Sequence, residues 1–166
     1  MGLITRAAGT GTAGNSGDDG PAAAAELNSP AGVAVTAAGG FLIADRLNHE
    51  VRAVSAAGVI TRVAGTGTAG NSGDDGPATD AELNSPAGVA VTAAGGFLIA
   101  DTGNNQVRAV SAAGVITRVA GTGTAGNSGD DGPATDAQLN NPTGVAVTAA
   151  GGFVIADTGN NEVRAV

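Results

Sequence analysis

The feature that most constrains this chain is an internal repeat of 56 residues. The sequence Val-Ile-Thr-Arg at 59–62 recurs at 115–118, and residues 3–6 read Leu-Ile-Thr-Arg. A period of this size is typical of solenoids, propellers and arrays, in which a unit buries its apolar faces only against a neighbour. We therefore expect a single repeat domain over residues 1–166. Its repeats are 3–58, 59–114 and 115–166.

The three repeats are nearly identical. The first two differ at 8 of 56 positions, and the second and third differ at 5 of the 52 that they share. So little divergence indicates that the sequence is either engineered or recently amplified. The fold can accordingly be argued from one unit.

Each unit predicts four short antiparallel strands. Residues 87–92 and 97–101 are apolar and rich in β-branched residues, and 106–111 alternates polar with apolar residues before a fourth strand at 115–120. Gly- and Asn-rich turns separate these runs. Four such strands make a propeller blade, so the sequence predicts an all-β fold, a β-propeller with three four-stranded blades per chain.

The polar, Gly-rich segment 65–86 is too long for a turn, and we expect it to cross from one blade to the next. Within it, Thr79 and Glu82 have the spacing of a capping box, which predicts one helical turn with a side-chain cap. The first repeat has Ala23 and Ala24 where the second has Thr79 and Asp80, so the turn there would lack its cap.

One unit also resembles a known family. Residues 84–91 read Asn-Ser-Pro-Ala-Gly-Val-Ala-Val, and 96–105 read Gly-Phe-Leu-Ile-Ala-Asp-Thr-Gly-Asn-Asn, with Val-Arg at 107–108. This pattern is similar to the NHL-repeat β-propellers, especially the bacterial type with the loop Ser-Gly-Asp-x-Gly-Pro-Ala-Thr, here 72–79. The resemblance covers the whole chain three times and implies a closed ring, usually of six blades.

Three blades alone would leave open sheet edges, which invite pairing with another chain. Residues 3–8 have the sequence of the fourth, outer strand of a unit, and the chain ends after the third strand of its last blade. We therefore predict a six-bladed ring completed by homodimerisation, with two-fold symmetry. Strand 3–8 of one copy would complete the last blade of the other. Ala7, in place of the Val of the other repeats, would weaken this joint slightly. The predicted interface residues are Leu3, Ile4, Thr5, Arg6, Ala7, Ala8, Glu162, Val163, Arg164, Ala165 and Val166.

Each long loop carries a pair of aspartates flanked by Asn, Ser and Gly. Oxygen-rich loops can bind Ca²⁺, so these carboxylates are candidate cation or ligand residues. Their spacing lacks the alternating ligands and final Glu of an EF-hand loop, and solvated turn-forming carboxylates are the favoured interpretation. The pairs are Asp18 with Asp19, Asp74 with Asp75, and Asp130 with Asp131.

Charged residues on the strands are interpreted as structural. Asp45, Asp101 and Asp157 end the second strand, where a carboxylate can accept amides of the following turn. The arginines of the third strand alternate with Val and are interpreted as solvated sheet charges that pair across strands. These arginines are Arg52, Arg108 and Arg164.

The composition excludes most catalytic chemistry. The chain has no Cys, no Lys and a single imidazole, His49, which we interpret as a turn residue. Acyl transfer, Schiff-base chemistry and a His-based zinc centre therefore lack their groups, and we expect no enzyme, cofactor or metal. A net charge of −8 disfavours nucleic acids and anionic membranes. No signal peptide or membrane span is evident, so we expect a soluble chain whose compartment the sequence does not assign.

Two functional hypotheses follow. The first is a non-enzymatic, self-assembling scaffold whose partner is a second copy of itself. The alternative is a recognition module that binds a protein, glycan or cation through the long loops or the central channel, although the chain has no Trp or Tyr to anchor such ligands.

Overall fold

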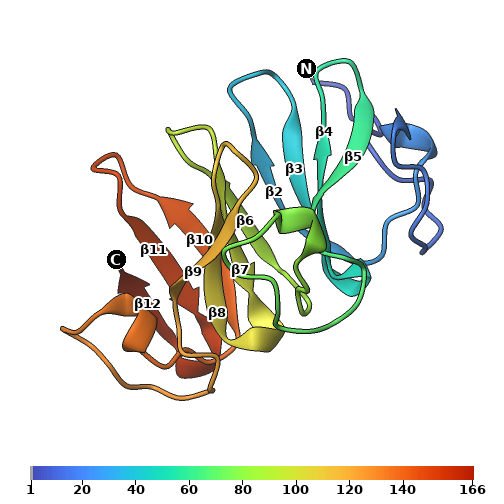
Figure 1. The fold of residues 1–166 in the computed structure, drawn as a ribbon. Coiled ribbons are helices and arrows are strands. Elements are labelled where there is room, and N and C mark those ends of the chain that lie inside the picture. The colour runs from blue at the N-terminus through green and yellow to red at the C-terminus, as the bar shows by residue number, and fades with distance from the viewer. Residues whose placement is uncertain (1) are drawn as a thin grey trace.

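Three antiparallel sheets stand side by side in the computed structural model, which describes residues 2–166 (Figure 1). We call them blades 1, 2 and 3. Met1, the first residue of the domain expected over 1–166, lies outside the described residues.

Blade 1 contains β1 (Gly20–Pro21), β2 (Pro30–Val35), β3 (Phe41–Asp45), β4 (Glu50–Val54) and β5 (Val59–Ala64). Blade 2 contains β6 (Gly88–Val91), β7 (Phe97–Asp101), β8 (Gln106–Val110) and β9 (Ile116–Ala120). Blade 3 contains β10 (Pro142–Val147), β11 (Phe153–Asp157) and β12 (Glu162–Ala165).

Within each blade, β2 to β5, β6 to β9 and β10 to β12 form meanders in which consecutive strands pair, and β1 adds to the outer edge of β5 in blade 1. The spatial orders are β1-β5-β4-β3-β2, β6-β7-β8-β9 and β10-β11-β12. A tight turn joins β4 to β5: the Gly58 amide donates to the Ser55 carbonyl oxygen at 2.9 Å, and the Ser55 amide donates to Val59. The four predicted strands form in blades 1 and 2, with the two-residue β1 as a fifth strand in blade 1, whereas blade 3 has three strands.

Short helical turns punctuate the loops. They are η1 (Ala22–Ala24), η2 (Arg46–Asn48), η3 (Ala78–Asp80), η4 (Thr102–Asn104), η5 (Ala134–Asp136) and η6 (Thr158–Asn160). Among the residues that the structure describes, no helix is long and apolar enough to cross a membrane.

The long loop leaves one blade and packs along the outer edge of the next. The Asp75 amide donates to the Ile116 carbonyl at 2.7 Å, and the Ala78 amide donates to Gly114 at 2.8 Å. The helical turn predicted there forms in all three repeats, but the predicted capping box is wrong: Pro77 precedes η3 and no side chain caps it. The first repeat forms the same turn without Thr or Asp, again after a proline, Pro21, and with Ala22 buried.

The innermost strands of neighbouring blades meet at glycines. A Cβ on Gly32 would lie 2.4 Å from the Ala87 carbonyl oxygen, and one on Gly88 would lie 2.7 Å from that of Thr143. Backbone therefore packs against backbone around the common axis. Outside this contact, the blades are joined by thin layers of small apolar side chains, as in the cluster that holds Leu42, Val89 and Ile99.

Candidate functional site

Two of the three third-strand arginines are buried and Arg164 is 10% exposed, which corrects their interpretation as solvated charges. Arg52 and Arg108 have no exposed surface. The Arg108 guanidinium donates to the backbone carbonyls of Glu82 at 2.7 Å and Ser72 at 3.0 Å, both in the long loop. It also pairs with Asp74 at 2.8 Å and Asp101 at 3.6 Å. Each arginine thus fastens the long loop to its blade, and the sequence did not show that this loop would cover it.

The carboxylates that end the second strand accept one hydrogen bond from the following turn, as predicted, and one from outside it. Asp101 Oδ2 accepts from the side-chain amide of Asn104, in the turn, at 2.8 Å. Asp101 Oδ1 accepts from the backbone amide of Asn84, which precedes the blade and was not predicted as a partner, at 2.8 Å. Burial raises the pKa of Asp101 from its ordinary 3.8 to about 6, and the bonds from Asn84 and Asn104 and the Arg108 charge oppose this rise.

The aspartate pairs divide into two roles: all six are exposed, as interpreted, but the first member of each pair also binds an arginine. Asp18 and Asp74 each bind a buried arginine at 2.8 Å, and Asp130 binds Arg164 at 2.7 Å. The second members, Asp19, Asp75 and Asp131, adopt left-handed backbone conformations in a turn. Over residues 2–166, no cluster of three or more His, Asp or Glu side chains is arranged to hold a metal ion.

His49 lies in a turn, as predicted, but it also joins two blades. It ends η2 in the left-handed conformation with φ of 55°. Its Nδ1 accepts a hydrogen bond from the Ser85 amide of the next blade at 3.1 Å. Asn105 Oδ1 accepts from Asn141 in the same way at 2.9 Å. Both residues therefore belong to a repeated joint between blades.

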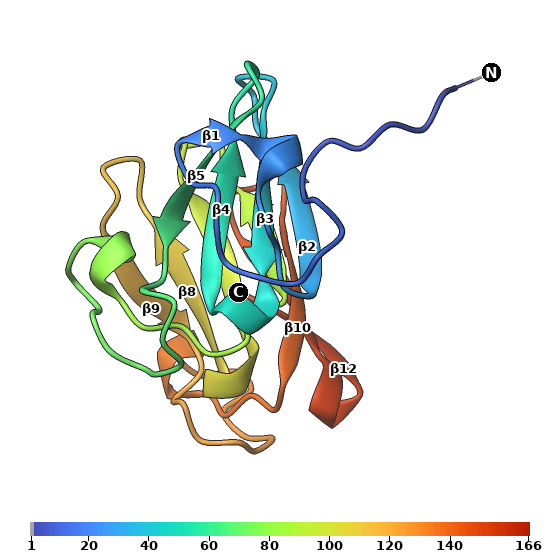
Figure 2. The same ribbon diagram turned by 90° about the vertical axis from the view of Figure 1, so that its right-hand side faces the viewer.

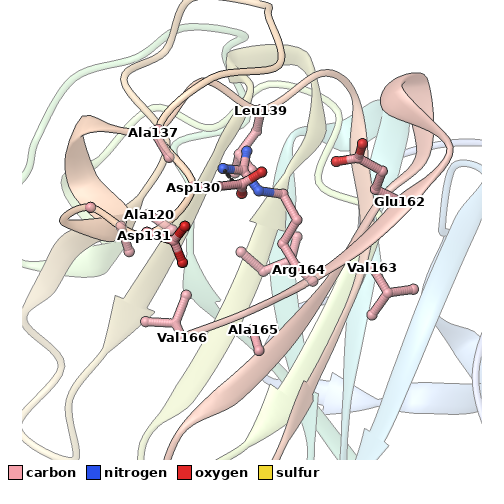
Figure 3. A pocket seen from close by; sticks show the side chains of 14 residues that line it. Ala120, Asp130, Asp131, Ala137, Leu139, Glu162, Val163, Arg164, Ala165 and Val166 are labelled. Carbon is pink, nitrogen blue, oxygen red and sulfur yellow. Dashed lines mark hydrogen bonds and ion pairs between the residues drawn. The ribbon is translucent and has the colours of Figure 1, made fainter.

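A cavity of about 830 Å³ lies against blade 3 where a fourth strand would run. β12 forms one side of it, and the loop from Gly129 to Ala137 forms the other (Figure 3). We call this cavity the strand slot. Its floor includes Ile155 and Arg164, and its outer edge carries the unpaired backbone of β12.

Blades 1 and 2 show what occupies the equivalent position. Ile60 of β5 is fully buried in a cluster with Ala22, Ala25, Ile43 and Val54. The residues at these four positions in blade 3 line the strand slot; they are Ala134, Ala137, Ile155 and Val166. The slot is therefore shaped for an outer strand with an isoleucine at this position.

Backbone donors also face the strand slot. In blade 1 the Asp19 and Ala22 amides donate to the carbonyls of Ile60 and Gly58, each at 2.8 Å. In the part of the chain that the structure describes, the equivalent amides of Asp131 and Ala134 have no such backbone partner. An occupant would bond to the loop on one side and to β12 on the other.

Residues 3–8, which were predicted to form an outer strand, do not pair with a strand of their own chain. The segment extends away from blade 1 and is not paired in a sheet (Figure 2). Leu3 and Ile4 are 94% and 101% exposed. The chain is first held at Gly9, whose amide donates to the Ala22 carbonyl at 2.9 Å.

The opposite end of the molecule presents a second unfilled surface. Val33 and Val35 of β2 are 70% and 79% exposed, whereas the equivalent Val89 in β6 is 7% exposed because blade 1 covers it. Beside them lies a recess of about 440 Å³ that Ser29 and Pro30 line. We call this recess together with Val33 and Val35 the leading face.

A family model for the NHL repeat matches residues 27–53, 83–109 and 139–165. The chain contains three NHL repeats. Each match runs from the end of the long loop through the third strand of a blade. The matches include the runs at 84–91 and 96–105 on which the sequence resemblance rests, whereas the loop at 72–79, which the resemblance also included, and the outer strand lie between matches.

Comparison with known proteins gives relatives of much greater length. Teneurin-4 of Homo sapiens and of Mus musculus are each 38% identical to this chain over 100 residues. That alignment includes 52% of this chain and 4% of either teneurin.

Solved structures share the fold. A structural genomics protein of unknown function from Bacteroides thetaiotaomicron has a TM-score of 0.68 at 25% identity, with 76% of this chain and 32% of that chain covered. An auxiliary nutrient binding protein from Bacteroides ovatus has a TM-score of 0.63 at 22% identity, covering 80% and 36%. A gluconolactonase from Xanthomonas campestris has a TM-score of 0.51 at 17% identity, covering 76% and 33%. The chain therefore has an NHL β-propeller-like fold and spans about a third of these structures.

Proposed function

We propose that the 166-residue chain is a non-enzymatic scaffold that assembles with a second copy of itself into one six-bladed ring. The observation that carries this proposal is the strand slot in blade 3, together with an exposed segment of outer-strand sequence at residues 3–8. Two copies related by a two-fold axis would each donate the segment that the other lacks, and a closed ring has no free blade edge.

The repeat defines the register of the exchanged strand. In blade 1, Val54 pairs with Ile60 and Val51 pairs with Ala64. The equivalent pairs are Val166 with Ile4, and Val163 with Ala8, each between two copies. Ile4 would then lie where Ile60 and Ile116 are fully buried in the first two blades.

Apolar exposure supports the same assembly. Nine large apolar side chains are exposed among residues 2–166, and six of them belong to the segment 3–8, the leading face or β12 and its end. Monomeric proteins rarely leave such residues clustered in water. The six are Leu3, Ile4, Val33, Val35, Val163 and Val166.

The leading face has a complementary surface on blade 3. Leu42 and Val89 share one core cluster where blade 2 follows blade 1. At the joint between copies, Val154 would take the place of Leu42 and pack against Val33. Asn161 stands where His49 and Asn105 accept an amide from the next blade, so it would accept the amide of Ser29 of the second copy.

A scaffold role also agrees with the chemistry of the charged groups. The carboxylates of Asp74 and Asp101 are engaged by Arg108, and the equivalent groups of the other blades have the same partners. Carboxylates held in this way fasten loops to blades. The likeness to a gluconolactonase at 17% identity supports the fold alone.

The test is the mass of the protein in solution across a dilution series. We expect twice the chain mass of 15.5 kDa for the original sequence. Ile4→Asp should give single chains, because it would place a charge in the apolar part of the slot. Ala57→Asp, in an exposed turn, should leave the mass of two chains unchanged. Single chains of the original protein at every concentration, or a stable mass of three or more chains, would overturn the two-chain ring.

A further inference from the structure

We propose that the strand slot is also a peptide-binding site, which takes a separate extended segment with the pattern apolar-Ile-Thr-Arg from another polypeptide. This activity goes beyond ring closure, because it requires neither a second copy of the chain nor an intact propeller. The ligand class is a β-strand with one isoleucine anchor, bound by strand addition.

The first argument is that the strand slot offers hydrogen bonds on both sides of the ligand. An ordinary sheet edge pairs with one side of an added strand. In blade 1, β5 pairs with β4 on one side and accepts from the Asp19 and Ala22 amides on the other. In blade 3, β12 and the amides of Asp131 and Ala134 occupy the equivalent positions on the two sides of the slot. A strand seated between them is paired along both edges, which selects an extended backbone and sets its direction.

The second argument is the isoleucine pocket. Ile116 of β9 shows the same complete burial as Ile60 in the neighbouring blade, so this contact is a property of the repeat. In blade 3, Ala137 and Ile155, which correspond to the residues Ala25 and Ile43 that pack with Ile60, are 5% and 1% exposed and line the open cavity. A buried apolar anchor of this kind is what gives a short ligand most of its affinity.

The third argument is charge. In blade 1, Arg62 of the outer strand β5 lies close to Glu50, the first residue of the adjacent strand β4. The Arg62 Nε atom is 4.0 Å from Glu50 Oε1. The equivalent carboxylate beside the slot belongs to Glu162, which is exposed. A chain with net charge −8 also attracts a cationic peptide at long range. The slot therefore favours a ligand with arginine two residues after its isoleucine.

The probe is a fluorescein-labelled peptide, Gly-Val-Ile-Thr-Arg-Val-Ala-Gly, which is the sequence of residues 58–65. It is titrated with the full-length Ile4→Asp protein, whose own segment 3–8 cannot enter the slot. We expect a saturable rise in fluorescence anisotropy. The same peptide with Asp in place of Ile should bind at least tenfold more weakly, because the anchor would be lost.

A protein variant locates the binding. Ala134→Phe, combined with Ile4→Asp, fills the isoleucine pocket and should abolish the anisotropy change, whereas Ala57→Phe in the same background should bind as before. Circular dichroism checks that both variants keep their strands. The comparison between the Ile and Asp peptides needs no core variant, so it decides the outcome even if Ala134→Phe fails to fold.

The two proposals fail in different ways. No saturable binding to the Ile4→Asp protein, or equal binding of the Ile and Asp peptides, overturns the peptide site and leaves the ring intact. Single chains of the original protein that still bind the Ile peptide overturn the ring and support the peptide site. If both hold, the original protein should bind the peptide more weakly than Ile4→Asp does, because its own segment competes.

Discussion

Three third-strand arginines hold the long loops, two of them fully buried and Arg164 partly exposed, and each one has partners in two elements. Arg108 forms ion pairs with Asp101 of its own blade and with Asp74 of the preceding loop, and it donates hydrogen bonds to two loop carbonyls. A guanidinium has five donors in a rigid planar arrangement, so it can satisfy all of these groups at once. The burial of this charge is compensated by bonds that also order the loop.

Removal of one such arginine should be strongly destabilising. We expect Arg108→Ala to lower the free energy of unfolding by about 3–5 kcal/mol, because the Asp101 carboxylate would remain buried without its cation. Urea unfolding followed by circular dichroism measures this change. Arg46→Ala is the matched control, since Arg46 is exposed, and it should change the free energy by less than about 0.5 kcal/mol. Similar losses for both variants would contradict the role given to Arg108.

The raised pKa of Asp101 predicts a pH dependence of stability. Its pKa is about 6 in the folded chain against 3.8 ordinarily, so the folded state binds more protons between these values. The free energy of unfolding should therefore rise as the pH falls from 7 to 5, by about 1 kcal/mol from this group. Urea titrations at both pH values measure it. In Asp101→Asn this contribution should disappear, and an unchanged pH response in that variant would refute the assignment.

At the scale of elements, the inner strands pack closely enough to exclude a methyl group. A Cβ on Gly88 would lie 2.7 Å from the Thr143 oxygen and 3.0 Å from the Gly144 Cα, both backbone atoms of β10. Gly88→Ala should thus push blades 2 and 3 apart and cost about 1–3 kcal/mol in unfolding free energy. Chemical denaturation provides the measurement.

Gly144→Ala is the matched control for this contact. The nearest heavy atom to a Cβ there is the Ala156 Cβ at 3.3 Å, so a single chain should tolerate the change nearly without loss. In the proposed ring, Gly144 takes the place that Gly88 has against blade 3. The variant should then weaken association while leaving the stability of isolated chains intact. Equal destabilisation by both substitutions at low protein concentration would contradict this account.

The strands could be predicted from the sequence because their signals are local. Apolar runs such as 97–101 end at Gly- and Asn-rich turns, and the period of 56 residues repeats them. The burial of Arg108 could not be predicted, because it depends on a loop that returns from about 30 residues away along the chain. The capping box failed for a related reason: the turn at Ala78 is held by Pro77 and by burial of the alanine, so its polar side chains are not needed.

The strand slot itself was accessible to sequence reasoning. Leu-Ile-Thr-Arg at 3–6 matches the outer strands of the other repeats, and Val-Arg-Ala-Val at 163–166 matches the third strand of blade 2 at 107–110, so comparison of the repeats indicates both partners of the slot. The sequence did not predict the hydrogen bond that joins the turn after the second strand to the next blade. Nothing in the residue types of the turn at Asn105 or Asn161 indicates such a bond. Its only signal is spacing: Asn105 and Asn141 are 36 residues apart, as are His49 and Ser85.

At the scale of the whole molecule, association should appear in thermal unfolding. The two chains of the proposed ring associate only when they are folded. The melting temperature of the ring should therefore rise with protein concentration by mass action. Differential scanning calorimetry at concentrations a hundredfold apart measures this shift. Ile4→Asp should melt at one temperature throughout the range. A concentration-independent melting temperature for the original sequence, together with the mass of two chains, would indicate an assembly that survives unfolding and would contradict the exchange of a single strand.

The tight turn between β4 and β5 also fixes how far apart the ends of two associated chains would lie. Between Val54 and Gly58 it uses three residues, Ser-Ala-Ala. Val166 and Gly2 occupy the positions of Val54 and Gly58, so in the ring three residues would span from Val166 of one copy to Gly2 of the other. Two copies fused from Val166 to Gly2 through a Ser-Ala-Ala linker, which replaces Met1 of the second copy, should then form one covalent propeller, whose melting temperature no longer depends on concentration.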